Sequence, residues 1–363
     1  MILKLKSPVG QWMMSLNKQE ISDIEKTKDI VGSLLSSKIV LCQSIKGGRN
    51  SQVYKFECAN GECFIGKFYY QDKNDSRDRL GVEYSSLEFL WQKGIRCVPQ
   101  PLTNDSKSCC AIYQYIDGKN FSGQDITQAD IDQALEFVVD LQNIQRNIPV
   151  SQFSDASEAY FSIEKIEANI EYRRKRLEGI KHEGLQDFLK ADFDIFWAEL
   201  VLWVKEKSLE TGVSLQETIA LDKRTLSPSD FGFHNAIKKK DGKIVFCDFE
   251  YFGWDDPAKL TSDFLLHPAM RLSEVLKGHF VRGIQNIFST HEDLRARLRV
   301  VYPLFAMKWC LILLNEFLAQ DFSRRLFADQ EIERERLLIQ QLDKAKNMLK
   351  HLKNMYQDNL YAK

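Results

Sequence analysis

The hydrophobic and polar residues of this chain follow two different periods, and the change between them divides it into two parts. Residues 16–36 carry apolar positions at helical spacing and predict an amphipathic helix. Short runs of β-branched and aromatic residues, separated by turn residues, then predict an antiparallel meander. The predicted strands are 39–45, 52–58, 63–70 and 110–116, with a helix over 82–92 and a proline-containing break at 98–101.

Beyond Gly118 the apolar residues recur at helical spacing over most of the remaining chain. One island at residues 225–257 interrupts the pattern and predicts a loop, two short strands joined by an Asp241-Gly242 turn, and a second loop. These patterns predict an α+β, two-lobed fold with an N-terminal sheet lobe and a larger, mainly helical C-terminal lobe. The expected segments are a helical extension, an N-lobe, a hinge and a C-lobe, at 1–37, 38–111, 112–118 and 119–363.

The composition indicates a folded, cytoplasmic protein. Its 363 residues exceed what one hydrophobic core usually serves, and a net charge of −1 argues against a dedicated nucleic-acid binder. Eight cysteines without a CxxC pair predict reduced thiols, and the first residues show no signal peptide. The most apolar stretch, 300–319, contains Lys308 and Glu316 and therefore predicts a core helix, not a membrane span.

The polar residues of the 225–257 island suggest phosphoryl-transfer chemistry. Asp230 and Asn235 lie five residues apart in a loop, and Asp248 ends a short apolar strand thirteen residues later. The predicted hairpin lets Asn235 and Asp248 face one site, and such oxygens are ligands that Mg²⁺ prefers. Each residue alone also fits a solvated loop or a cap, since the D-x₄-N spacing occurs about once by chance in a chain this long.

The first third offers groups that suit a triphosphate. A Gly-Gly-Arg-Asn-Ser segment, 47–51, lies between two predicted strands, where glycine lets backbone N–H groups approach phosphate. Lys67 lies in an apolar strand, where an ammonium–phosphate attraction is worth roughly 4 kcal/mol per unit charge. Glu83, on the following helix, is placed to hold Lys67. An ordinary hairpin turn and a surface helix carboxylate are the alternatives.

From about residue 39 to residue 263, the chain resembles the aminoglycoside phosphotransferase / choline kinase family of small-molecule kinases. The segments that carry the resemblance are GGRNSQVYKF, IGKFYY, GVEYSSLEFL, IYQYIDG, SDFGFHN and CDFEYFGWDDPAKLTSDF. The resemblance implies a protein-kinase-like fold and an ATP- and Mg²⁺-dependent phosphotransferase acting on a small-molecule hydroxyl.

The resemblance also implies a role for each matching residue. Asp230 becomes the catalytic aspartate, and Asn235 and Asp248 become the metal ligands. Lys67, oriented by Glu83, becomes the ligand of the phosphates. The nucleotide-binding loop and hinge comprise Gly47, Gly48, Arg49, Asn50, Ser51, Gln114, Tyr115 and Ile116.

The chain departs from the family pattern in one place, where Pro228-Ser229 replaces His-Gly before Asp230. His234 is interpreted as a hydrogen-bonded loop residue. The alternatives are a catalytically silent nucleotide-binding scaffold, a choline or ethanolamine kinase, and a protein kinase, which lacks support because no Ala-Pro-Glu follows. The acceptor is left open, with a sugar or sugar-linked metabolite favoured. Aromatic residues offered for it are Tyr160, Tyr172, Trp197, Trp203, Trp254 and Trp309.

Overall fold

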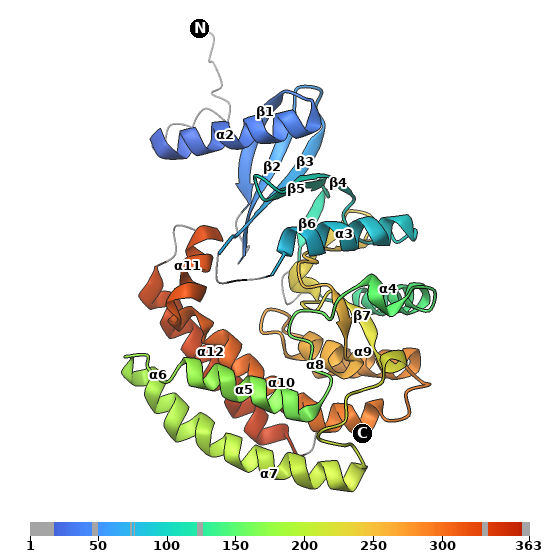
Figure 1. Ribbon diagram of the computed structural model, residues 1–363, viewed down its shortest axis with the longest axis vertical. Helices are drawn as coiled ribbons and strands as arrows, with labels where there is room; N and C mark the ends of the chain where they lie inside the picture. The colour runs from blue at the N-terminus through green and yellow to red at the C-terminus, as the bar shows by residue number, and fades with distance from the viewer. Residues whose placement is uncertain are drawn as a thin grey trace.

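The computed structural model describes residues 18–45, 50–72, 75, 77–121, 126–328 and 333–357. Figure 1 shows a smaller lobe built on a sheet beside a larger lobe made mostly of helices. The predicted α+β, two-lobed architecture is confirmed.

The sheet of the smaller lobe has five antiparallel strands in the order β1-β2-β3-β5-β4. Their bounds are β1 Ile39–Ile45, β2 Ser51–Cys58, β3 Cys63–Tyr69, β4 Pro101–Asp105 and β5 Cys110–Gln114. The predicted meander is present, but strand β4 was missed because its first residue, Pro101, was taken as part of a break. An edge strand tolerates proline at its first position, since that residue need not donate to the ladder.

Two helices accompany the sheet. Helix α2 (Lys18–Leu35) matches the predicted amphipathic helix, and its Val31 packs with Cys42 and Phe56 of the sheet. Helix α3 (Arg79–Gln92) begins after Asp78, whose side chain accepts a hydrogen bond from the Gly81 amide.

The lobes are joined by a short connection. Strand β5 ends at Gln114, and β6 (Gly118–Asn120) already belongs to a sheet of the larger lobe, so residues 115–117 alone form the link. The small sheets of that lobe contain β6, β7 (Thr225–Ser227), β8 (Ala236–Lys239), β9 (Ile244–Phe246) and β10 (Gly253–Asp255). The β8–β9 hairpin turns at Asp241-Gly242, as predicted; β6 was not predicted, because three residues show no period.

The helices of the larger lobe are α4 Gln128–Gln145, α5 Ile163–Arg176, α6 Glu183–Asp187, α7 Asp194–Thr211, α8 Pro257–Leu266, α9 Glu274–Ile287, α10 Leu294–Leu313, α11 Ala319–Ala328 and α12 Arg334–Met355. Helix α10 packs against α5, α7, α8 and α12. In the described part of the chain, one stretch, Leu294–Phe317, is long and apolar enough to cross a membrane, and 83% of its apolar window is buried inside the protein. It therefore serves as the core helix that the sequence predicted. The eight cysteines are all free.

Candidate active site

The residues singled out in the catalytic loop meet at one cavity. Asp230, Asn235 and Asp248 all line this cavity, which has a volume of about 630 Å³. The β8–β9 hairpin places the last two side by side, because the Cys247 amide donates to the Asn235 carbonyl at 2.7 Å. The hairpin therefore brings the predicted metal ligands to one site.

The carboxylate of Asp230 is contacted by an amide and by two imidazoles. The side-chain nitrogen of Asn235 lies 3.2 Å from Asp230 Oδ2 and 3.0 Å from its main-chain oxygen. His234 Nε2 lies 3.0 Å from Oδ1, and His267 Nε2 lies 3.9 Å from it. The two imidazoles stack with their centroids 3.5 Å apart. His234 is thus the hydrogen-bonded loop residue that was predicted, whereas His267, at the end of α8, carried no local signal.

Ser229 occupies the position where the resembled motif has glycine. Its φ of +67° lies in the left-handed region that favours glycine. Its hydroxyl donates to the Ser157 carbonyl at 2.8 Å and accepts from the buried Lys259 ammonium at 3.0 Å. Lys259 in turn contacts Asp255 at 2.8 Å. These contacts support the loop that carries Asp230 without the His-Gly pair.

Ser229→Ala is expected to lower the free energy of unfolding by about 1–3 kcal/mol, because the Ser157 carbonyl and one Lys259 N–H lose their partner. Ser229→Gly loses the same hydrogen bonds but relieves about 1 kcal/mol of left-handed strain. Urea unfolding should therefore rank wild type first, glycine second and alanine last. Equal midpoints for all three proteins would show that the hydroxyl contacts do not support this loop.

Lys67 lies at the centre of a buried carboxylate cluster. Its Nζ is 2.6 Å from Glu83, 2.6 Å from Asp248 and 3.8 Å from Glu250. Burial by itself lowers the pKa of an ammonium, but the three carboxylates hold the pKa of Lys67 well above its ordinary value. The contact with Glu83 suggested by the sequence is present, and the role of Lys67 toward phosphate stays a prediction.

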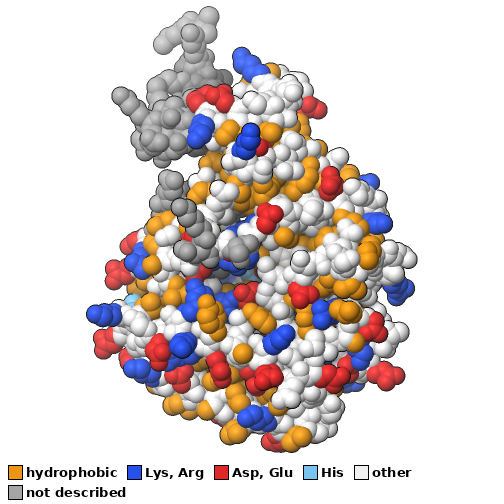
Figure 2. All heavy atoms as spheres, in the orientation of Figure 1, with side chains coloured by type: hydrophobic (Ala, Val, Ile, Leu, Met, Phe, Trp, Pro, Cys, Tyr) orange, Lys and Arg blue, Asp and Glu red, His pale blue; other side chains and the backbone are white. Residues whose placement is uncertain are grey.

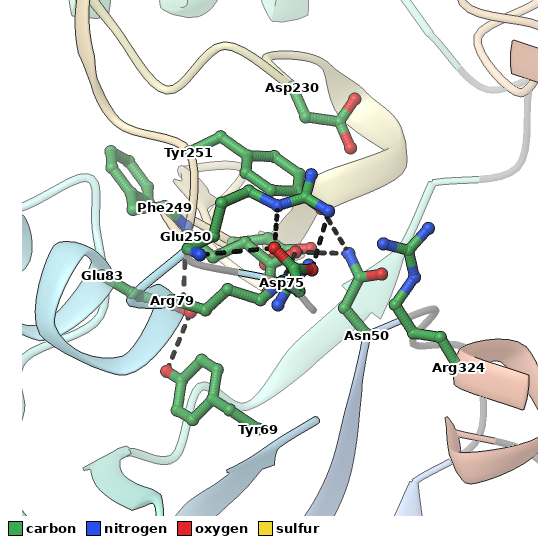
Figure 3. A network of polar contacts seen from close by, with 12 residues as sticks. Asn50, Tyr69, Asp75, Arg79, Glu83, Asp230, Phe249, Glu250, Tyr251 and Arg324 are labelled. Carbon is green, nitrogen blue, oxygen red and sulfur yellow. Dashed lines mark hydrogen bonds and ion pairs between the residues drawn. The ribbon is translucent and has the colours of Figure 1, made fainter. Parts of the chain in front are cut away.

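Glu250 is a member of this cluster that was not singled out in the sequence. It is 3% exposed, and burial, with repulsion from Asp248, raises the pKa of Glu250 to about 7. The Asn50 amide donates to its Oε1, while Oε2 has no hydrogen-bond partner among the described residues. Figure 3 shows the network around Glu250 together with the nearby Asp230 carboxylate. The sequence signal that could have identified Glu250 is its position two residues after Asp248, in Asp-Phe-Glu.

The oxygen atoms of this cluster fit a divalent cation. Carboxylate oxygens of Glu83, Asp248 and Glu250 lie within 4.8 Å of one another. Asn235 uses its amide nitrogen toward Asp230, which leaves its side-chain oxygen for another partner. Hard oxygen donors suit Mg²⁺, and a buried carboxylate oxygen without a hydrogen bond indicates a need for more positive charge.

The expected nucleotide loop and hinge are placed only in part. Three loop residues lie outside the described residues: Gly47, Gly48 and Arg49. Asn50 donates to the Tyr251 hydroxyl at 2.7 Å and so joins the two lobes, while Ser51 begins β2 opposite Tyr69. The predicted hinge residues lie at the end of β5 and in the linker: Gln114, Tyr115 and Ile116.

The aromatic residues offered for the acceptor divide between the cavity and the core. Trp309 lines the cavity and donates from Nε1 to Asp263 at 2.8 Å. Trp203 and Trp254 are buried in the core, and Tyr172 is exposed on α5. Trp197 packs against the core. Tyr160 donates to Glu158 at 3.2 Å, and its ring lies 4.8 Å from the Lys308 ammonium. Trp309 and Tyr160 are therefore the candidates near this cavity.

Comparison with protein-family models and with curated protein sequences finds no match. Solved structures match over most of the chain. A choline kinase from Streptococcus pneumoniae is 15% identical with a TM-score of 0.57, covering 90% of this chain and 98% of that one. A spectinomycin phosphotransferase in complex with ADP and spectinomycin is 13% identical with a TM-score of 0.58, covering 89% and 98%. An ethanolamine kinase from Plasmodium vivax is 16% identical with a TM-score of 0.53, covering 89% and 84%.

These likenesses show the fold. The chain has the protein-kinase-like fold of the choline kinases and aminoglycoside phosphotransferases, as its motifs predicted.

Proposed function

We propose that this protein is an ATP- and Mg²⁺-dependent kinase that transfers the γ-phosphoryl group to a hydroxyl of a small molecule. One observation carries the proposal: a lysine–glutamate pair, two metal-type oxygen ligands and a cavity-facing aspartate meet between the two lobes. Phosphoryl transfer needs this combination of positioning and charge. Among similar structures, one was solved with ADP, which supports an adenine nucleotide as the donor.

Asp230 would orient the acceptor hydroxyl and accept its proton as the oxygen attacks the γ-phosphorus. The bond from that phosphorus to the β,γ-bridging oxygen breaks, and ADP leaves. His234 and Asn235 fix the carboxylate so that it faces the cavity. Lys67 would bind the α- and β-phosphates while Glu83 keeps its ammonium in place.

Asp248 and Asn235 would hold Mg²⁺, with Glu250 close by. When bound, the ion neutralises charge on the β- and γ-phosphates. The raised pKa of Glu250 agrees with a site built for added positive charge.

The proposal is tested by incubating the protein with ATP·Mg²⁺ and a panel of hydroxyl metabolites, including sugars, choline and ethanolamine. ADP formation is coupled to absorbance, and products are identified by mass spectrometry. A phosphorylated metabolite that disappears with Asp230→Asn supports the kinase. ATP binding without any phosphorylated product would support a silent scaffold, and phosphate on protein would support a protein kinase.

Lys67→Met is expected to weaken ATP binding by roughly 10–100-fold, the loss of a hydrogen bond between charged groups. It also leaves Glu83 buried without its cation, so unfolding should become easier by about 3–5 kcal/mol. Calorimetric titration with ATP·Mg²⁺ and urea unfolding measure the two effects separately.

The double variant Lys67→Met with Glu83→Gln is the matched control. It removes the buried ion pair as a unit and is expected to recover much of the stability but none of the ATP affinity. Unchanged ATP affinity in the single variant would contradict the assignment of Lys67.

A further inference from the structure

The cavity is lined by cations and carboxylates, and several of the cations lie beyond Asp230. Figure 2 shows Lys and Arg side chains gathered around the hollow between the lobes. The cations that line the cavity are Arg77, Arg173, Lys259, Lys308, Arg324 and Arg325. The carboxylates that line it are Glu158, Asp230, Asp248, Asp263, Glu316 and Asp321.

The charges at the deep end of the cavity are arranged as two cations on one carboxylate. Arg173 Nη2 lies 2.7 Å from Glu158 Oε2, and Lys308 Nζ lies 3.2 Å from the same oxygen. Both cations are nearly buried, with side chains 10% and 2% exposed, whereas the Glu158 side chain is 33% exposed. In this group two nearly buried cations therefore share one partly exposed carboxylate at the wall of the cavity.

Lys308 has few oxygen partners, although its ammonium also lies over the Tyr160 ring, 4.8 Å from the ring centroid. Among the described residues, its ammonium meets oxygen atoms only on Glu158, at 3.2 Å and at 3.4 Å. It lies in the buried core helix α10, where burial outweighs Glu158 and lowers the pKa of Lys308. A buried lysine in this state gains from a further anionic partner.

The same arrangement recurs closer to the sheet lobe. Asp321 on α11 receives both Arg176, at 2.7 Å, and Arg324, at 2.5 Å. Asp75 receives both Arg77, at 2.7 Å, and Arg79, at 2.6 Å. In each group two cations share one carboxylate, although Arg79 also lies 3.9 Å from Glu250.

The cluster around Lys259 has the opposite composition, two carboxylates on one cation. Lys259 contacts both Asp255, at 2.8 Å, and Asp263, at 3.1 Å. The second oxygen of Asp263 accepts from Trp309 Nε1 at 2.8 Å. Asp263 is therefore already engaged on both oxygens.

These cations lie close to the proposed point of transfer. Ser229, next to Asp230 in the chain, donates to the Ser157 carbonyl, and Glu158 is the following residue. Glu158, Arg173, Lys308 and Asp230 all line the same cavity. The lining also includes Asn50 and Asp248, so the cavity extends from the proposed metal ligand past Asp230 to Arg173 and Lys308.

We propose that the acceptor is an anionic hydroxyl compound and that Arg173 and Lys308 bind its carboxylate or phosphate group. This inference rests on the proposed kinase function. A guanidinium offers two parallel N–H groups to such an anion, and the adjacent ammonium adds a point charge. The hydroxyl of the same molecule would then face Asp230.

The experiment compares acids with their neutral and amino counterparts. Gluconate and glucose 6-phosphate are tested against glucose, glucosamine and choline, within a wider panel of hydroxy acids and sugar phosphates. Binding is measured by calorimetry in the presence of ADP·Mg²⁺, and phosphorylation by mass spectrometry with ATP·Mg²⁺. The acids should bind and react in preference to their neutral and amino counterparts. A response to the hydroxy acids indicates a carboxylate ligand, and a response to the sugar phosphates indicates a phosphate ligand.

Two variants of opposite sign make the test specific. Lys308→Met removes the ammonium and keeps an unbranched apolar side chain, which suits the buried helix. This variant should weaken acid binding about 10–100-fold. Glu158→Gln removes the competing carboxylate and should tighten acid binding. ATP affinity should stay unchanged in both, and Lys223→Met, whose partner Asp293 lies outside the cavity lining, should change neither.

Several results would overturn the inference. These are a preference for neutral or amino acceptors, loss of ATP affinity in Lys308→Met, weaker acid binding in Glu158→Gln, or no Lys308-dependent binding across the panel. The two proposals fail separately. Lys308-dependent acid binding without any phosphorylated product would contradict the kinase function and support the anion site. Phosphorylation of cationic acceptors alone would support the kinase function and contradict the anion site.

Discussion

Asp230→Asn is expected to lower kcat by about 10²–10⁴-fold, the usual contribution of a positioned proton acceptor. Asparagine keeps the size of the side chain but cannot take up the hydroxyl proton. Asp230 lies outside the carboxylate cluster around Lys67, so ATP affinity should stay within a few-fold of wild type. Steady-state kinetics and calorimetric titration with ATP·Mg²⁺ measure the two quantities.

Asp241→Asn is the matched control for this variant. Asp241 is an exposed aspartate at the turn of the β8–β9 hairpin, which follows the Asp230 loop, and its replacement should change neither rate nor affinity. A wild-type rate in Asp230→Asn would dismiss the catalytic role. Loss of ATP binding would instead mean that Asp230 supports the loop. Replacing Pro228-Ser229 by His-Gly then tests how far loop geometry limits the rate.

Asp248→Ala is expected to lower activity by about 10³-fold or more, and raised Mg²⁺ should not restore it. The reason is that charge stabilisation by a metal contributes several kcal/mol, and each 1.36 kcal/mol is tenfold in rate. The protein should remain folded, because Lys67 keeps Glu83 at 2.6 Å after Asp248 is removed. Rate measurements over a Mg²⁺ series, with circular dichroism as a check on folding, give the answer.

Asn235→Ala provides the comparison at the second ligand. A neutral amide oxygen binds the ion less strongly than a carboxylate, so this variant should lose less activity and regain part of it at high Mg²⁺. If both variants show the Mg²⁺ dependence of wild type, the metal site lies elsewhere.

The sequence predicted the elements whose residues lie close together in the chain. The meander, the helix carrying Glu83 and the Asp241-Gly242 hairpin all follow from short-range periods and turn residues. Strand β4 was missed because Pro101 reads as a break, although at the start of an edge strand it leaves the ladder intact. The three-residue strand β6 is too short for any period to show.

What only the tertiary structure decided is how charges far apart in the sequence compensate one another. Glu250 meets Asn50 from the other lobe, His267 comes to lie beside Asp230, and Lys308 meets Glu158 across 150 residues of chain. A local pattern reports which residues share a strand, a turn or a helix face. Whether a buried charge has enough partners depends on which elements pack against it. The sequence alone therefore determined the fold class and the candidates for catalysis, whereas packing decided which cations remain available to a substrate.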